Sequence, residues 1–240
     1  MKKFSLIIPY YRSPLMLQKQ LENVLEYMDD FDIIVVDDCS QEPAENIINK
    51  DHNIQLFRID DDIPWNREGA RNLGAFKANT EWIIHLDTDH ILKKECADNL
   101  LNTSLDTNHW YRFPRYRNGK ADDTRRKDAI PDDQEYGKIK PHIDSYLCTK
   151  ELYMESGGYN EEYSGCLGGG GPFLKHLAKT GGESLLVPDN VYLEVYTKSN
   201  IKDASVCDLS RDKTEFKLRK KKFGTKKAIN CLRFKYHQIY

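Results

Sequence analysis

Asp87 ends an apolar segment, 82–87, which reads WIIHLD, and Asp89 follows it with one residue between the two acids. Carboxylates at positions i and i+2 of an extended segment point to the same side, and they repel each other unless a cation lies beside them. Mg²⁺ and Mn²⁺ take oxygen ligands and share their coordination shell with substrate phosphates. The spacing therefore predicts a Mn²⁺ or Mg²⁺ site at Asp87 and Asp89. The alternative is a turn in which these acids cap the following helix.

Two more pairs of polar residues have a binding interpretation and a structural one. Asp37 and Asp38 end the apolar segment 32–38, where they either accept hydrogen bonds from a ligand or shape the following loop. Arg67 and Arg71 are four residues apart and so share one face of a helix. Guanidinium groups suit bidentate contacts with phosphate, but the same pair also fits a solvated helix face with acidic neighbours.

A run of glycines lies in the segment 165–172, which reads GCLGGGGP. Glycine lets the backbone approach a ligand closely or take positive φ. The run leads into a helix that we expect to begin near Pro172, and free N–H groups at a helix N-terminus can hold an anion. A flexible loop is the alternative. No Lys-Ser or Lys-Thr pair follows, so the run is not a Walker A loop.

The elements that position these residues alternate between strand and helix in the first half of the chain. Expected strands cover 4–9, 32–38, 54–60 and 82–87, and helical spacing appears at 17–28, after Pro43 and at 66–79. This alternation predicts an α/β fold with a mostly parallel sheet, in which ligands bind beyond the carboxyl ends of the strands. Later strands are expected at 109–113, 143–149, 185–188 and 191–196, whereas 114–142 is expected to be irregular.

The composition limits the class of protein. A chain of 240 residues fits one large domain better than two small ones, and a net charge of −2 argues against a nucleic-acid binder. The six cysteines are scattered singly, which predicts reduced thiols in the cytoplasm. Residues 213–240 hold ten Lys or Arg and one acid. This tail is expected to be either a solvated helix or a contact with anionic membrane lipid or a lipid-linked phosphate.

Four motifs in order carry a resemblance to a known family: SLIIPYYRS at 5–13, DIIVVDDCS at 32–40, the Arg-bearing and Gly/Ala-rich helix 66–79, and LDTDH at 86–90. Together they resemble the GT-A glycosyltransferases, in particular the family 2-like enzymes. The resemblance implies a Rossmann-like GT-A domain over 1–211, with a nucleotide-binding half (1–95), an acceptor half (96–211) and a basic helical extension over 212–240. It also implies transfer of a sugar from a UDP- or GDP-linked donor to a hydroxyl of a glycan, a lipid-linked sugar or a protein.

The resemblance gives roles to matching positions. The nucleotide pocket would be lined by Pro9, Tyr11 and Arg12, with Asp37 and Asp38 toward the base or ribose and with Arg67, Arg71 and Arg211 toward the phosphates. Asp87 would approach the ribose or the metal, and Asp89 would ligate Mn²⁺ or Mg²⁺.

The sequence departs from the family pattern where a general base is expected. The family places an acidic pair ahead of an apolar helix, and this chain has Gly170 and Gly171 there. The base would then be another carboxylate, and Asp144, Glu161 and Glu162 are the nearest by position. In addition, Cys207 and Asp208 stand where some relatives carry a metal-binding histidine.

Two other functions fit parts of the sequence. Loss of the base would leave a module that binds a sugar nucleotide without turnover. LDTDHIL also resembles the strand end of haloacid-dehalogenase-type phosphatases, in which Asp87 would be the nucleophile. That pattern departs at Ile91, and no later apolar strand ends in the required acid pair.

Overall fold

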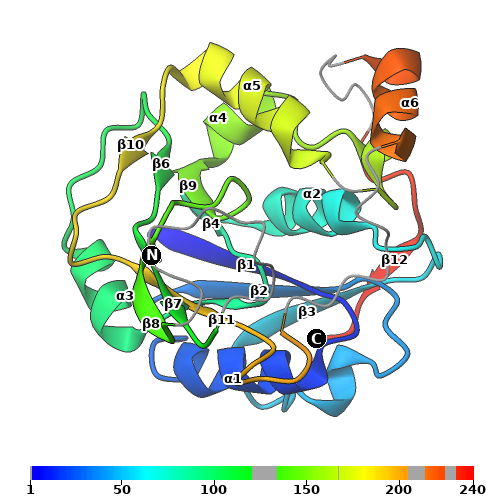
Figure 1. Cartoon of the computed structure of the whole chain (residues 1–240). Helices are drawn as coiled ribbons and strands as arrows, with labels where there is room; N and C mark the ends of the chain where they lie inside the picture. The colour runs from blue at the N-terminus through cyan, green and yellow to red at the C-terminus, as the bar shows by residue number, and fades with distance from the viewer. Residues whose placement is uncertain (1, 121–133, 167, 205–213, 225–230) are drawn as a thin grey trace.

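A computed structural model describes residues 2–120, 134–166, 168–204, 214–224 and 231–240, and its main feature is an eight-stranded sheet (Figure 1). The order of the strands is β10-β6-β9-β4-β1-β2-β3-β12. Their bounds are β1 (Phe4–Tyr10), β2 (Asp32–Asp37), β3 (Ile54–Ile59), β4 (Trp82–His85), β6 (Tyr111–Arg112), β9 (Tyr146–Thr149), β10 (Leu185–Leu186) and β12 (Tyr236–Gln238).

The centre of this sheet is parallel. β1 pairs in parallel with both β2 and β4, and β2 pairs in parallel with β3. The register places Tyr10 of β1 beside Asp37 of β2 and Ile7 of β1 beside His85 of β4. The polar residues that follow these strands therefore meet at one edge of the sheet. The predicted α/β class with a mostly parallel sheet flanked by helices is confirmed.

Helices cover both faces of the sheet, with α1 below it and α2 above it in Figure 1. The helices are α1 (Pro14–Val24), α2 (Arg67–Lys77), α3 (Lys94–Leu101), α4 (Lys150–Glu155), α5 (Gly170–Gly181) and α6 (Thr214–Phe223), with 3₁₀ turns η1 (Ala44–Asn46) and η2 (Glu161–Tyr163). Alternate strand residues face opposite layers, since Ile8 packs in the core with α1 and Ile7 in the core with α2. The helix expected after Pro43 is only the short turn η1.

A second, four-stranded sheet has the order β5-β11-β7-β8. Its strands are β5 (His90–Leu92), β7 (Arg115–Asn118), β8 (Tyr136–Ile139) and β11 (Leu193–Tyr196). The expectation that 114–142 is irregular is wrong at β7 and β8, which pair with each other in antiparallel fashion. The inward positions of β7 are Arg115 and Arg117, which are both buried. An alternation made of arginines gives no hydrophobic signal, which explains the error.

The C-terminal tail is a helix followed by an edge strand. α6 ends at Phe223, and β12 then pairs with β3 in antiparallel fashion, with Gln238 opposite Phe57. Phe234 is buried in the α2 layer of the core. The description of 212–240 as a helical extension is therefore corrected, since its last part completes the main sheet. Within the described ranges, no helix has the length and apolar character that a membrane span requires.

Helix α2 lies unusually close to β1 because of its small residues. A Cβ atom at Gly74 would lie 2.4 Å from Cγ2 of Ile7, well inside contact distance. A side chain at this position would push the helix away from the sheet.

Replacing Gly74 with Ala should therefore destabilise the fold. Overpacking costs about 1–3 kcal/mol and the better helix propensity of Ala returns about 1 kcal/mol, so the free energy of unfolding should fall by up to about 2 kcal/mol. Urea denaturation measures this difference. Gly171→Ala in α5 is the matched control, because no described residue lies within 4 Å of its added Cβ. Equal unfolding free energies for the two variants would contradict the close packing of α2 on β1.

Candidate active site

Asp87 and Asp89 lie in a turn between β4 and β5 rather than on an extended strand. β4 ends at His85, and the N–H of His90 donates to the carbonyl oxygen of Asp87 at 3.0 Å. Thr88 anchors the turn to the end of β1, since its hydroxyl donates to the carbonyl oxygen of Pro9 at 2.6 Å. The expectation of two carboxylates on one side of an extended segment is therefore corrected, and each acid has its own surroundings.

Asp87 is held by a cation from α2 and by a histidine from a distant segment. Arg71, fully buried, donates to one carboxylate oxygen of Asp87, and Nδ1 of His142 lies 2.9 Å from the other. Burial by itself would raise the pKa of Asp87, but the Arg71 guanidinium and the His142 imidazole hold that pKa well below its usual value. Asp87 is therefore an anion across the neutral pH range.

Arg67 joins two more carboxylates to this group. Its Nη1 donates to Asp144 at 2.9 Å and its Nη2 donates to Glu68 at 2.7 Å. The other oxygen of Asp144 lies 3.6 Å from Nη1 of Arg71. We call Arg67, Glu68, Arg71, Asp87, His142 and Asp144 the buried ionic cluster. It brings the predicted residues Arg67, Arg71, Asp87 and Asp144 together at the carboxyl edge of the sheet.

The same region contains a set of groups that can hold a metal ion. One ligand atom each from Asp87, His90 and His142 lie within 4.8 Å of one another. One carboxylate with two imidazoles is a donor set that fits Mn²⁺ better than Mg²⁺. Burial, together with the nearby Arg115, holds the pKa of His90 well below its usual value, so this imidazole is neutral as a ligand must be. The site therefore fits a divalent metal.

Both histidines were missed by the sequence analysis, and the predicted ligand Asp89 lies outside this three-residue set. The nearest carboxylate oxygen of Asp89 is 4.0 Å from Nε2 of His90. His90 directly follows the D-x-D motif, a signal that could have been used. His142 comes from a segment more than fifty positions later, and no spacing rule connects it with Asp87. The assignment of Asp89 as a metal ligand stays a prediction.

The adjacent acids at the end of β2 have different surroundings. Asp37 accepts hydrogen bonds from the N–H groups of Ser40 (2.8 Å) and Ala44 (3.0 Å) and from the Arg58 side chain. Asp37 therefore shapes the loop. Asp38 is 2 % exposed, neither of its oxygens accepts a side-chain hydrogen bond among the described residues, and the backbone N–H of Asn66 lies close enough to lower its pKa. Burial is the main reason why its pKa is raised to about 8. Asp38 is the acid that is left for a ligand.

The loop after β1 lies between Asp38 and the Asp87 turn. Arg12 has a φ of 48°, and its N–H donates to the Ser40 hydroxyl at 3.1 Å. Its guanidinium carbon lies 4.9 Å from the centre of the Tyr11 ring. Pro9, Tyr11 and Arg12 are thus at the predicted edge of the sheet, and their role in nucleotide binding stays a prediction. Arg211, Cys207 and Asp208 lie outside the described residues.

Two of the proposed bases are occupied by other contacts. Glu161 accepts hydrogen bonds from the side chain of Asn72 (2.8 Å) and from the N–H groups of Leu232 (2.7 Å) and Arg233 (3.1 Å). It joins α2 to the C-terminal segment. Glu162 is 32 % exposed at its side chain and pairs with Arg233. Of the three carboxylates expected as bases, only Asp144 lies in the buried ionic cluster.

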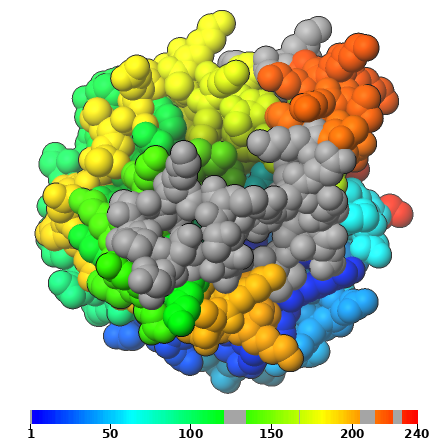
Figure 2. All heavy atoms as spheres, viewed as in Figure 1, coloured from blue at the N-terminus to red at the C-terminus, as the bar shows by residue number. Residues whose placement is uncertain are grey.

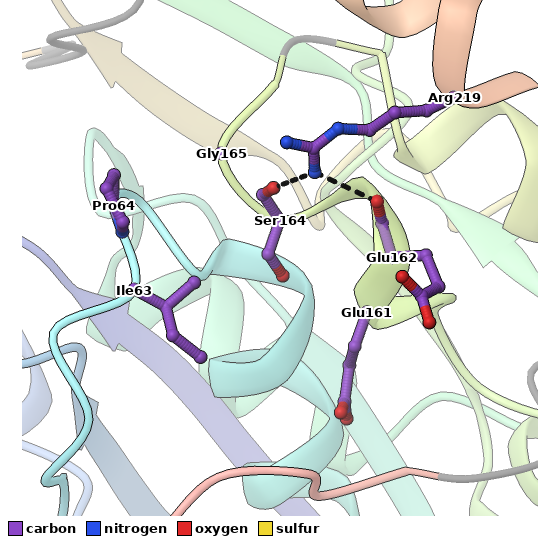
Figure 3. A pocket seen from close by; sticks show the side chains of 7 residues that line it. All are labelled: Ile63, Pro64, Glu161, Glu162, Ser164, Gly165 and Arg219. Carbon is purple, nitrogen blue, oxygen red and sulfur yellow. Dashed lines mark hydrogen bonds between the residues drawn. The ribbon is translucent and has the colours of Figure 1, made fainter.

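A surface pocket lies between η2, the loop before α2 and helix α6 (Figure 3). Arg219 of α6 lies at this pocket and donates to the carbonyl oxygens of Glu162 (2.9 Å) and Ser164. The lining residues are Ile63, Pro64, Glu161, Glu162, Ser164, Gly165 and Arg219. None of them belongs to the buried ionic cluster, so the pocket is separate from that cluster.

Comparison with known proteins identifies the family of this arrangement. The family model "Glycosyl transferase family 2" matches residues 5–161, which is more than half of the chain. The poly(ribitol-phosphate) beta-N-acetylglucosaminyltransferase TarP of Staphylococcus aureus (strain N315) is 27% identical over 113 residues, which cover 45% of this chain and 35% of TarP. An uncharacterized glycosyltransferase of Haemophilus influenzae (strain KW20 / Rd) is 30% identical over 112 residues, which cover 44% of this chain and 43% of that protein. The chain thus spans less than half the length of these relatives.

Solved structures agree on the fold. The crystal structure of S. aureus TarS 1-349 in complex with UDP-GlcNAc has a TM-score of 0.61 and 16% sequence identity, and the match covers 85% of this chain and 62% of that chain. The identity is low, so this similarity shows the fold alone. Together with the family match, it leaves the phosphatase alternative without support.

Glu161 should matter for stability, because a neutral side chain cannot replace its contacts. In Glu161→Gln the new amide NH₂ would face N–H donors, and leaving such groups unpaired costs about 1–3 kcal/mol of unfolding free energy. Urea denaturation followed by circular dichroism measures the loss. Glu162→Gln is the control, since a half-exposed pair contributes only about 0–1 kcal/mol. A stable Glu161→Gln variant would show that the C-terminal segment does not depend on this carboxylate.

Proposed function

The chain belongs to glycosyl transferase family 2, and we propose that it transfers a sugar from a UDP-linked donor to a hydroxyl group of an acceptor. The observation that carries the proposal is the meeting of the anionic Asp87, the buried Arg71, the largely buried Arg67 and the buried Asp38 at one edge of the sheet. Carboxyl ends of parallel strands are where such folds bind nucleotides. The TarS structure with UDP-GlcNAc makes N-acetylglucosamine the first sugar to test.

Asp38 supports a uracil base over guanine. With a pKa of about 8, its carboxyl group is mostly protonated at neutral pH, so it offers one donor and one acceptor. The edge of uracil offers an N–H donor beside a carbonyl acceptor, which matches a neutral carboxyl group. The edge of guanine offers two adjacent donors, which match an ionised carboxylate better. We therefore assign the donor as UDP-linked, with Asp38 toward the base.

A divalent cation would be held by Asp87, with His142 and His90 as neighbouring ligands and Asp89 beside them. Such an ion, when bound, neutralises the negative charge that develops on a leaving diphosphate. Arg71 and Arg67 lie next to the same position and would contact the phosphates through their guanidinium groups.

The acceptor is proposed to carry phosphate groups. The relatives TarP and TarS are named for a poly(ribitol-phosphate) acceptor. In this chain, helix α6 exposes Lys217, Lys220, Lys221 and Lys222, and its atoms form a raised patch at the upper right of the face in Figure 2. Lysines attract a chain of phosphates by charge alone. A lipid-linked acceptor or an anionic membrane would meet the same lysines, so membrane contact stays a prediction.

The direct test is donor binding that depends on the metal. A thermal-shift series with UDP-GlcNAc, UDP-glucose, UDP-galactose and a GDP-sugar, each with and without Mn²⁺, should show stabilisation by a UDP-sugar that increases when Mn²⁺ is present. His142→Ala should weaken the apparent affinity for Mn²⁺ by at least about 10–100-fold, since even the loss of a ligand's hydrogen-bonding neighbour usually costs that much. His109→Ala, which changes a histidine of a distant loop, is the control. No stabilisation by any nucleotide sugar would refute the proposal.

The pH dependence of UDP binding tests the role of Asp38. Only the protonated carboxyl group matches uracil, so the Kd for UDP should rise about tenfold per pH unit once the pH exceeds about 8, because the competent fraction falls in that proportion. Asp38→Asn keeps one donor and one acceptor at every pH. That variant should bind UDP at pH 7 and lose the dependence above pH 8, apart from the ionisation of the nucleotide itself.

Calorimetry from pH 7 to pH 9 with both proteins measures this difference. The same ionisation of UDP affects both titrations and therefore cancels in the comparison. Identical pH profiles for the two proteins, or loss of UDP binding in Asp38→Asn at pH 7, would show that Asp38 does not recognise the base as a neutral acid.

A further inference from the structure

The glycines at the start of α5 are in contact with two carboxylates of the buried ionic cluster. A Cβ atom at Gly170 would lie 2.2 Å from Oδ1 of Asp144, and a Cβ atom at Gly169 would lie 2.3 Å from Oε1 of Glu68. Around a Cβ atom at Gly171, the described part of the chain has no atom within 4 Å. The carboxylate of Asp144 therefore fills the space that any side chain at position 170 would take. This is the position where the family pattern places an acid.

Asp144 has one oxygen without a hydrogen bond. The side chain is 4 % exposed, and Oδ2 accepts from Nη1 of Arg67 at 2.9 Å. Oδ1 is buried and has no hydrogen-bond partner among the described residues, and Nη1 of Arg71 remains 3.6 Å away. A buried oxygen without a partner costs free energy, so a donor from a ligand would be bound favourably. A hydroxyl group is such a donor.

Asp144 is also close to the place proposed for the diphosphate. Arg71 lies between Asp144 and Asp87 and contacts both. His142 and Ser145, from the same segment as Asp144, contact the Asp87 side chain and its N–H group. Asp144 is therefore separated by one guanidinium group from the acid that would face the metal and the donor.

We propose that Asp144 is the general base of the transfer, supplied from the segment before β9 to the position that Gly170 leaves open. This inference rests on the proposed function. The acceptor oxygen forms a bond to the anomeric carbon, the bond from that carbon to the diphosphate oxygen breaks, and its electron pair leaves with UDP. The proton of the acceptor hydroxyl passes to Oδ1 of Asp144. The displacement is direct, so the configuration at the anomeric carbon is inverted.

Glu68 is the main competitor for this role. It is fully buried, it shares Arg67 with Asp144, and its Oε2 has no partner among the described residues. Glu68 lies in the first turn of α2, however, and among the described residues no hydrogen bond or ion pair joins Glu68 or its partner Arg67 to Asp87. Asp144 has that link through Arg71.

The first test separates chemistry from binding. At saturating concentrations of the donor selected by thermal shift, where a change in donor affinity no longer affects the rate, UDP release by Asp144→Asn should fall about 10²–10⁴-fold, the usual contribution of a general base. Water serves as the acceptor in this assay, so no acceptor polymer is needed. Glu68→Gln measured in parallel decides between the two carboxylates. Full UDP release by Asp144→Asn, or loss of release only in Glu68→Gln, would overturn the proposal while leaving the proposed function intact.

The second test moves the carboxylate to position 170. Gly170→Asp alone should lose activity, because its side chain collides with Asp144, and Asp144→Ala alone should lose activity for lack of the base. The double variant Asp144→Ala/Gly170→Asp should release UDP at least about tenfold faster than Asp144→Ala, since its carboxylate returns to the same space. Gly171→Ala is the control with no neighbour to disturb.

The outcomes remain distinguishable. If the double variant binds the donor but releases UDP no faster than Asp144→Ala, then a carboxylate at position 170 cannot replace that of Asp144. A wild-type chain that binds no nucleotide sugar would refute both proposals at once.

Discussion

The structure depends on two guanidinium groups that α2 carries into the protein interior. Arg71 is fully buried and Arg67 nearly so, and neither is tolerable there without negative charge beside it. Their partners come from different parts of the chain: Glu68 from the same helix, Asp87 from the turn after β4, and Asp144 from the segment before β9. Removing one partner would leave a buried charge and cost about 3–5 kcal/mol. The network that holds these segments together is thus also the one that assembles the candidate site.

Glycines in α2 let the helix pack close to its neighbours, and this close packing brings Arg67 and Arg71 into the interior. Gly74 lets α2 touch Ile7 of β1, and Gly69 lies against Phe234 of the C-terminal segment. A larger residue at either position would lift the helix and withdraw the guanidinium groups from Asp87 and Asp144. The C-terminal segment therefore contributes to the site without touching it, because it closes the outer side of α2 through Phe234 and through Glu161.

The sequence was sufficient to predict the parallel centre of the sheet and the acids at its edge, because both depend on local patterns. Each strand there is an apolar run, and each run ends in polar residues. The second sheet was not predicted, since the buried positions of β7 are Arg115 and Arg117. β12, His142 and the contact between Asp144 and Gly170 depend on pairings across many residues, which no local pattern records. The choice between Asp37 and Asp38 also required the structure, because adjacent residues on a strand point to opposite sides.

Two buried acids at this edge, Asp38 and Asp144, show how surroundings give one residue type two uses. Burial is the main cause that raises the pKa of Asp38, and the neighbouring carboxylates of Asp37, Glu68 and Asp62 raise it further, so the neutral form is favoured. Asp144 instead forms ion pairs with Arg67 and Arg71. A neutral carboxyl group can both donate and accept, which suits recognition of a base, whereas a carboxylate can only accept, which suits removal of a proton. Asp38 and Asp144 both have buried oxygens that lack hydrogen bonds to side chains of the described residues, which costs free energy of folding. The nucleotide-sugar donor would supply the missing hydrogen bond at Asp38, and the acceptor hydroxyl would supply it at Asp144.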